Sequence, residues 1–511
     1  MIINNFFNSL NCSINKKFFR SKELLILNYS LLILFSSCSV TSQISKQAKA
    51  TILSDSAISK GFIGISIYEP ATNKYWYNYN ATKYFTPASN TKLFTLYAGM
   101  KYLGDSLTGI YYQEFDKNNI NIIATGDPTF LHSDFKNQPI LDFLRSQNKT
   151  IHISNDFRDE ALGYGWAWDD YNDDYMAERS AFPIHGNTVK IDIQGYKPKA
   201  YKPAEPNWNG HGNEIEAIVN KANRSSEPTW NMQPDYFKNL IDTVFVVPQS
   251  AIAHTPDTNE LSKKTKSFLI KRDRSNNKFS LVYNPQIKAF TKAEIPFATN
   301  GINTAVDILK TEFGLNIKYD RLYQNGTDTM ILGRLPFHRI KTQPTDSLFR
   351  PMMHRSDNFF AEQTLLMVSN ERLGYMSDAD IIDTLLKSDL KDLPQRPKWV
   401  DGSGLSRYNL FTPQAFVYIL NKLKNEFGWD RVRNILPTGG EGTLTSYFHK
   451  DSGFIYAKTG TLSNNCALSG FLLTNSGKLL IFSILANHYQ SGATPIRKAS
   501  ERFLEEIRKK Y

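Results

Sequence analysis

The chain has 511 residues, a formal net charge of +11, 41% hydrophobic residues and 21% charged residues. This length suits two or more domains, and the composition excludes a disordered or fibrous chain. The basic residues are scattered, without zinc-finger spacing or an arginine-rich helix, so the charge indicates a solvated basic surface and we expect no nucleic-acid partner.

The first 38 residues have the layout of a secretory signal. Basic residues between positions 16 and 22 precede the apolar run 24–35, which is short for a membrane-spanning helix and is interrupted by Asn28. Cys38 follows directly in a segment that resembles a bacterial lipoprotein cleavage site, so we predict lipid attachment there, with ordinary cleavage or an uncleaved anchor as alternatives. All three place the folded part outside the cytoplasm, in the periplasm, and we expect the polar residues 39–59 to form a tether.

Two strands are predicted at 61–70 and 74–80, followed by a helix from Ser89 to about Leu103. The sequence then changes to short strand-like runs separated by Gly, Pro, Asn and Asp residues, which indicates a β-rich insertion. Apolar periodicity farther along predicts helices, three successive strands and a closing helix. The predicted elements after Leu103 are strands 120–125, 188–193 and 242–247, helices 298–313, 359–373 and 413–427, strands 454–460, 467–474 and 478–487, and helix 499–510.

Strands at both ends of the chain, with helices between them, indicate an α+β fold. We expect a main domain built from 60–112 and 296–511, an α/β sandwich whose sheet is formed by both chain ends. Residues 113–295 would form a separate inserted lobe of one or more β-rich domains.

Ser89-Asn90-Thr91-Lys92 opens the first predicted helix. Positions i and i+3 lie on one face of a helix, which puts the Lys92 amine beside the Ser89 hydroxyl. A serine needs an adjacent base to act as a nucleophile, and a lysine can serve when burial or a nearby cation lowers its pKa. Alone the pattern is weak, because a helix-capping serine with an exposed lysine gives the same residues.

Ser356-Asp357-Asn358 precedes the helix predicted at 359–373. Its hydroxyl can relay a proton and its amide can hold a substrate amide group. The alternative is helix capping, for which all three residue types are well suited.

Lys458-Thr459-Gly460-Thr461 lies on a predicted strand. The glycine permits close approach of another backbone, and Lys458 and Thr459 can bind a carboxylate. The alternative is a strand end with an exposed lysine.

In this order, the three motifs are the signature of penicillin-binding proteins and serine β-lactamases. Ser356 follows Lys92 by 264 positions, a longer gap than in common β-lactamases. The long gap resembles the class C low-molecular-mass penicillin-binding proteins, the D-alanyl-D-alanine carboxypeptidase/endopeptidase family. Further segments that resemble this family are Gly126-Asp127-Pro128-Thr129, Asp401-Gly402-Ser403-Gly404-Leu405-Ser406-Arg407, and Leu436-Pro437 with Gly442-Thr443-Leu444.

The resemblance runs from about residue 55 to the C-terminus, and it is weakest across about 200–290, where no segment can be matched to the family. It implies a penicillin-binding/β-lactamase-like transpeptidase domain with a β-rich insertion between the first and second motifs. It also implies a serine peptidase that acts on peptidoglycan stem peptides as a D-Ala-D-Ala carboxypeptidase, an endopeptidase or both, with β-lactams as covalent inhibitors. We expect no metal and no cofactor, and a membrane partner only through the N-terminal anchor.

The resemblance also assigns roles to the motif residues. Ser89 would be acylated, Lys92 would take its proton, and Ser356 would pass a proton to the leaving group. The remaining assignments are Asn358 for orienting the acyl side chain, Lys458 and Thr459 for the terminal carboxylate, the N–H groups of Ser89 and Thr461 for the oxyanion, and Asp170, Tyr175 and Arg407 for the free end of the stem peptide.

Two other functions remain open. A β-lactamase would use the same chemistry with fast deacylation, although the insertion and the lack of a recognisable deacylating Glu loop argue against it. A non-catalytic wall-binding or β-lactam-sensing protein is disfavoured because the full set of reactive residues is present. Likewise, Arg407 and Asp170 suit a structural ion pair and a turn as well as they suit substrate binding.

Overall fold

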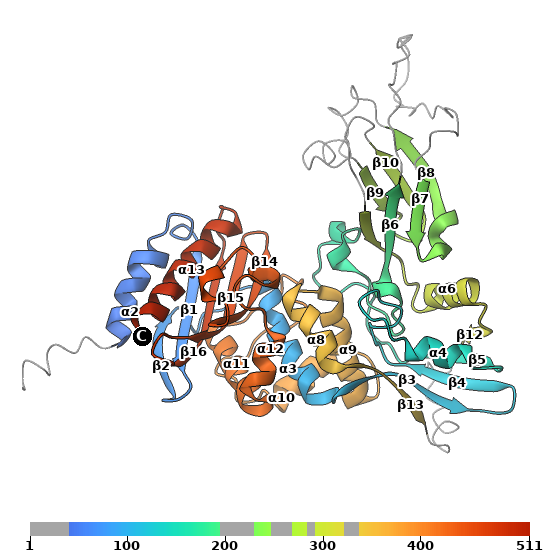
Figure 1. Cartoon of the computed structure of the whole chain (residues 1–511), viewed down its shortest axis with the longest axis horizontal. Coiled ribbons are helices and arrows are strands. Elements are labelled where there is room, and N and C mark those ends of the chain that lie inside the picture. Colours follow the sequence, from blue (N-terminus) through green and yellow to red (C-terminus); the bar gives the residue numbers. More distant parts are fainter. Residues whose placement is uncertain (1–39, 195–228, 247–267, 284–291, 321–336) are drawn as a thin grey trace, which may run out of the picture.

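The computed structural model describes residues 40–194, 229–246, 268–283, 292–320 and 337–511, and shows two parts side by side (Figure 1). Helices and sheets are mixed, which is the predicted α+β fold. The predicted signal and Cys38 lie outside the described residues, as does much of 200–290. In the described ranges, no helix combines the length and apolar character needed to cross a membrane.

The sheet of the first part is antiparallel and joins the two ends of the chain. Its strand order is β14-β15-β16-β1-β2, so that β1 pairs with β16 from Phe62 opposite Asn487 to Tyr68 opposite Ile481. The strands agree closely with the predicted ones. They are β1 (Phe62–Glu69), β2 (Lys74–Tyr79), β14 (Ile455–Leu462), β15 (Asn465–Leu473) and β16 (Leu479–Asn487).

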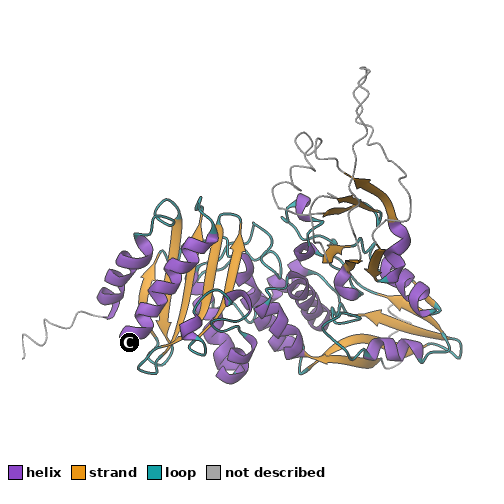
Figure 2. Cartoon of the chain, turned by 45° about the horizontal axis from the view of Figure 1, so that its top comes forward, coloured by secondary structure: helices purple, strands orange, loops and turns teal. Residues whose placement is uncertain are grey.

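Both faces of this sheet are covered, which explains why β16 is an almost unbroken apolar run. Its Ile481 and Leu485 pack with α11 (Pro413–Phe427), while Phe482 and Ile484 pack under α13 (Ala493–Lys510). Figure 2 shows α13 lying along the sheet. The sequence predicted the start of α13 six residues too late.

The N-terminal segment is not the predicted tether. It forms the helix α2 (Val40–Ala48) and a π-helical turn η1 (Lys49–Leu53), which pack beside α13. Ile44, Ala48 and Ile52 are fully buried in the same core as Phe503. These three residues recur every four positions and therefore lie on one helix face, a short stripe that the polar residues around it obscure.

The helices between the chain ends form a second core against the other face of the sheet. The central one, α3 (Lys92–Tyr102), has an almost wholly buried surface, so it lies inside the helical layer. The other helices of this layer are α8 (Thr345–His354), α9 (Asn358–Leu373), α10 (Asp378–Lys387), α11 and α12 (Trp429–Ile435).

The second part is built on a mixed sheet in the order β12-β5-β4-β3-β13. Two smaller sheets, β11-β6-β7 and β8-β10-β9, lie beyond it (Figure 1). The strands are β3 (Ser106–Glu114), β4 (Asn119–Ala124), β5 (Thr150–Ser154), β6 (Thr188–Gln194), β7 (Thr229–Gln233), β8 (Ile241–Val246), β9 (Phe268–Arg272), β10 (Phe279–Tyr283), β11 (Lys292–Pro296), β12 (Ile317–Tyr319) and β13 (His338–Pro344), with helices α4 (Pro139–Arg145) and α6 (Asn303–Phe313).

The boundaries predicted for the inserted lobe are too narrow. β3 starts at Ser106 and pairs with β13, which ends at Pro344, so 106–112 and 296–344 belong to the second part and not to the main domain. The reason is that β3 and β13 complete one sheet from opposite ends of the insertion. Such long-range pairing leaves no mark in the local sequence pattern.

Candidate active site

The first motif lies where the chain enters α3 through a 3₁₀ turn, η2 (Ala88–Thr91). Ser89 is partly exposed, whereas Lys92 is completely buried. Lys92 Nζ lies 3.0 Å from Ser89 Oγ, 2.6 Å from Asn358 Oδ1 and 2.8 Å from the carbonyl oxygen of Ser403. A neutral amine can donate to the amide and carbonyl oxygens and accept the serine proton.

Burial lowers the pKa of Lys92, so that a larger fraction of this lysine is neutral, and able to act as a base, near neutral pH. It lowers the Lys92 pKa from 10.5 to about 8, against the opposing charges of Glu362, Asp401 and Asp357. Each of these carboxylates accepts a backbone N–H group: Ser403 N bonds Glu362, Gly404 N bonds Asp401, and Phe360 N bonds Asp357.

The second motif connects α8 to α9. Asp357 caps α9 by accepting the Phe360 N–H group at 3.0 Å, so the capping interpretation holds for this residue. Ser356 has a left-handed backbone with φ of 62°, unusual for a residue with a side chain and typical of functional positions. Asn358 bonds Lys92 through Oδ1, and its Nδ2 donates to the carbonyl oxygen of Tyr175 at 2.9 Å, which ties the second part to the site.

The third motif lies on β14, whose edge faces the first motif. Lys458 is fully buried and its Nζ lies 2.8 Å from Ser356 Oγ. Burial, followed by the charges of Lys92 and Arg497, lowers its pKa well below 10.5. A Cβ atom on Gly460 would lie 2.6 Å from the Pro87 carbonyl oxygen and 3.1 Å from Ser89 N, so only glycine lets β14 approach the serine this closely.

The free edge of β14 presents N–H groups toward this approach. Ala457 N donates to the carbonyl oxygen of Pro437, on the side away from β15. Because strand geometry repeats every two residues, the N–H groups of Thr459 and Thr461 point to the same edge. The structure thus brings the Thr461 N–H group to the edge that carries the close contact with Ser89.

A buried loop after α10 completes the surroundings of Lys92, and sequence reasoning gave no chemical role to its residues 401–406. Ser403 supplies the carbonyl that bonds Lys92, and a Cβ atom on Gly404 would lie 1.9 Å from the Ala88 carbonyl oxygen. Asp401 holds the loop by accepting N–H groups of Gly404 and Ser406 at 2.8 and 2.6 Å. The only signal in the sequence was the resemblance of 401–407 to a family segment.

A buried ion network lies behind this loop and joins the two parts. Glu362 Oε2 lies 3.6 Å from Arg179 Nη1, and Arg179 also pairs with Asp378. Burial and then the charge of Asp401 raise the Glu362 pKa, while Arg179 opposes this shift. Arg179 comes from the second part, so this network helps to fix that part against α9.

Two of the three residues expected to hold the stem peptide contact one another in the structure. Asp170 and Tyr175 share a side-chain hydrogen bond, and burial followed by the charge of Asp173 raises the Tyr175 pKa. The hydrogen bond found for Arg407 instead goes to the carbonyl oxygen of Ser463 in the β14–β15 turn, at 3.3 Å. Arg407 is exposed and pairs with no acid in the described part of the chain.

The sequence matches the D-Ala-D-Ala carboxypeptidase 3 (S13) family over residues 45–255 and 298–507, two stretches that carry all three motifs. The chain belongs to this family. Two relatives of this S13 member are carboxypeptidase DacB of Mycolicibacterium smegmatis, 31% identical over 29% of this chain and 35% of that relative's length, and the D-alanyl-D-alanine carboxypeptidase of Actinomadura sp. (strain R39), 24% identical over 87% of this chain and 81% of that protein.

The fold of this S13 member is also found among solved structures. Penicillin binding protein 4 (dacB) from Haemophilus influenzae superposes with a TM-score of 0.66 at 20% sequence identity, covering 91% of this chain and 99% of that chain. The similarity extends over both parts of the molecule and shows a shared penicillin-binding fold.

Proposed function

We propose that this S13 family member is a serine D-Ala-D-Ala carboxypeptidase, with cleavage of cross-linked peptidoglycan peptides as a second reaction of the same site. The observation that supports this best is the contact between Lys92 Nζ and Ser89 Oγ at 3.0 Å, with Lys458 Nζ on Ser356 Oγ at 2.8 Å. Each of the two buried lysines thus contacts one serine hydroxyl. Lys92 is the base for Ser89, and Lys458 with Ser356 forms the proton relay.

Acylation then follows from the positions of these groups. Ser89 Oγ attacks the carbonyl carbon of the D-Ala-D-Ala bond while its proton passes to the neutral Lys92 amine. The Ser89 and Thr461 N–H groups stabilise the oxyanion, each contributing on the order of 3 kcal/mol. When the C–N bond breaks, the proton on Lys92 returns through Ser356 Oγ to the leaving amine, and free D-alanine departs.

Deacylation repeats these steps with water in place of serine. Lys92 takes a proton from the water as it attacks the ester carbon, and the proton returns to Ser89 Oγ when the ester C–O bond breaks. A β-lactam forms the same ester, but its leaving group stays attached to the acyl group. The adduct therefore blocks the approach of water.

The setting that we propose is the cell envelope. Peptidoglycan lies outside the cytoplasm, which agrees with the export signal predicted for residues 1–38. Lipid attachment at Cys38 and the grip of Asp170, Tyr175 and Arg407 on the stem peptide belong to the same proposal. Labelling with a lipid precursor, compared between wild type and Cys38→Ser, tests the anchor.

Digestion of purified muropeptides tests the reaction. Wild type should release D-alanine from pentapeptides or split cross-linked dimers, Ser89→Ala should do neither, and Ser388→Ala, which removes an exposed hydroxyl at the end of α10, should match wild type. Benzylpenicillin should add its mass to Ser89 and stay bound. Rapid turnover of nitrocefin would indicate a β-lactamase instead, and no adduct at all would refute an active serine enzyme.

A further inference from the structure

Arg497, on α13, differs from the other two arginines of that helix. Arg502 pairs with Asp55 at 2.8 Å and Arg508 pairs with Asp451 at 3.0 Å. Arg497 has no acidic partner among the residues that the structure describes, and its buried Nε atom has no hydrogen-bond partner there. A partly buried guanidinium without a carboxylate is costly unless an anion completes its coordination.

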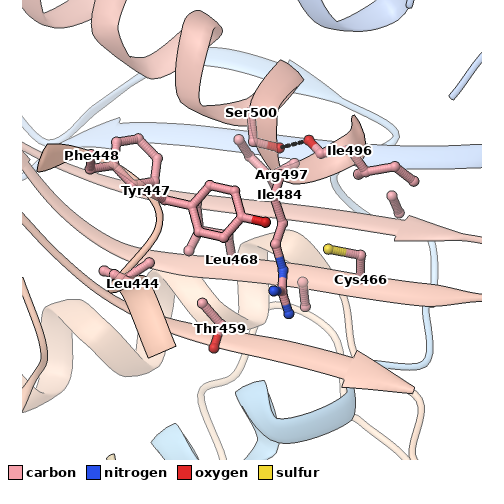
Figure 3. Close-up of a pocket in the computed structure, with 12 residues that line it drawn as sticks. Leu444, Tyr447, Phe448, Thr459, Cys466, Leu468, Ile484, Ile496, Arg497 and Ser500 are labelled. Carbon is pink, nitrogen blue, oxygen red and sulfur yellow. Dashed lines mark hydrogen bonds between the residues drawn. The ribbon is translucent and has the colours of Figure 1, made fainter. Parts of the chain in front are cut away.

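The Arg497 side chain points at the third motif. Its Nη2 donates to Thr461 Oγ1, and its guanidinium lies 5.6 Å from the centre of the Tyr447 ring. Figure 3 shows the side chain running from α13 across the sheet, with the guanidinium between Thr459 and Cys466. Arg497 and Thr459 line the same pocket at this end of β14.

The local charge favours an anion at this place. Lys458 is fully buried, and the Lys458 pKa is lowered by burial and by the positive charges of Lys92 and Arg497. The Arg497 guanidinium therefore adds positive charge at the edge of β14, beside two lysines whose charged forms are disfavoured by burial. A carboxylate bound there would pair with the guanidinium and would also accept hydrogen bonds from it and from the threonine hydroxyl.

The substrate carries a carboxylate at the matching distance. In a peptide ending in D-Ala-D-Ala, the terminal carboxylate and the scissile nitrogen share one Cα atom, so the carboxylate lies within about 4 Å of the attacked carbonyl carbon. The group that recognises it must therefore lie beside the oxyanion donors. Thr461 meets this condition, because its N–H group points to the edge of β14 that approaches Ser89.

We propose that Arg497 and the Thr461 hydroxyl bind the terminal carboxylate of the substrate and the corresponding carboxylate of β-lactams. The inference rests on the proposed function and adds Arg497, a residue outside the three motifs, to the groups expected to bind this carboxylate. Thr459 is only 5% exposed and its hydroxyl donates to Thr443 Oγ1 at 2.7 Å, while its side chain lies on the same face of β14 as that of Thr461, two residues along the strand. Lys458 stays with Ser356 as part of the proton relay.

A matched pair of substrates tests this role. One is an acylated peptide ending in D-Ala-D-Ala, and the other is the same peptide with a C-terminal carboxamide. Wild type should prefer the acid in kcat/KM, and Arg497→Gln should reduce this preference by on the order of 10- to 100-fold, the range expected for hydrogen bonds to a charged group. Arg497→Lys should retain part of it, and Arg502→Gln, an equal charge change on the same helix, should retain all of it.

The outcomes separate the two proposals. If wild type is not acylated by benzylpenicillin at Ser89, the proposed function fails. If wild type is acylated and prefers the acid, yet Arg497→Gln loses activity equally on acid and amide, then Arg497 only shapes the site and the inference is overturned. Thermal melting checks that Arg497→Gln is folded, and if it is not, Arg497→Lys and the substrate ratio decide the matter.

Discussion

The pH dependence of acylation is the sharpest consequence of the site. Only the neutral form of Lys92 can take the Ser89 proton, and burial lowers the pKa of this lysine to about 8. With that pKa, about one tenth of the lysine is neutral at pH 7 and about one hundredth at pH 6, whereas a lysine at its usual 10.5 would be neutral in only about one molecule in 3000 at pH 7. The rate should therefore fall about 90-fold from pH 9 to pH 6.

The direction of this pH dependence follows from the positive charge that Lys92 gains on protonation. Protonation inactivates the base, so activity is lost as the pH falls through the folded pKa and reaches a plateau above it. Intact-mass measurement of the second-order rate of benzylpenicillin acylation gives the profile directly. Because Lys92 and Lys458 influence one another, the midpoint belongs to the pair, and the 3.0 Å contact with Ser89 supports Lys92 as the proposed base.

Two variants complete this prediction. Lys92→Ala should lower the acylation rate by about 10²- to 10⁴-fold on the plateau above pH 9, the usual contribution of a positioned base, and should remove the dependence on pH. Lys101→Ala removes a lysine of the same helix that pairs with Glu426 at the surface, and should leave the profile unchanged. A rate that is flat from pH 6 to pH 9, or one that still rises tenfold per pH unit above pH 9.5, would show that burial does not acidify Lys92.

Three further predictions concern packing. Gly460→Ala should cost about 1–3 kcal/mol in stability, because its Cβ would lie 2.6 Å from the Pro87 carbonyl oxygen. It should also lower the acylation rate by about 10²- to 10³-fold, since β14 must move away from Ser89 and the oxyanion hole is disrupted. Normal acylation would mean that the close approach is unimportant. Ile52→Ala should lower the free energy of unfolding, measured with denaturant, by about 2–5 kcal/mol, because the segment predicted as a tether belongs to the core. A cost near zero would support the tether interpretation instead. Arg179→Met should lower the free energy of unfolding by about 3–5 kcal/mol, because it leaves buried carboxylates unpaired. The control Arg158→Met, at a largely exposed ion pair with Asp156, should lower it by at most about 1 kcal/mol. Equal costs would contradict the buried network.

The sequence alone determined the parts of the fold that local patterns encode. Helix α11 was predicted at its true bounds because Thr412 and Pro413 mark its start. The strands of the main sheet were predicted within two residues or so, because their apolar runs are bounded by turns. The family was also predicted correctly from the motifs, since three short patterns in a fixed order identify it where one would not.

Only the tertiary structure decided which distant groups meet. The pairing of β3 with β13 set the true limits of the second part, and no local pattern records a partner more than 200 residues away. For the same reason the sequence did not predict the contacts of Ser403 and Arg497. Ser403 contributes only a backbone carbonyl group. Arg497 lies outside every motif and reaches β14 only because α13 packs on the sheet. Residue type and spacing thus singled out Ser89 and Lys92 as the proposed nucleophile and base, while burial, strand pairing and helix packing set the pKa of Lys92, the distance between the two groups and the position of Arg497.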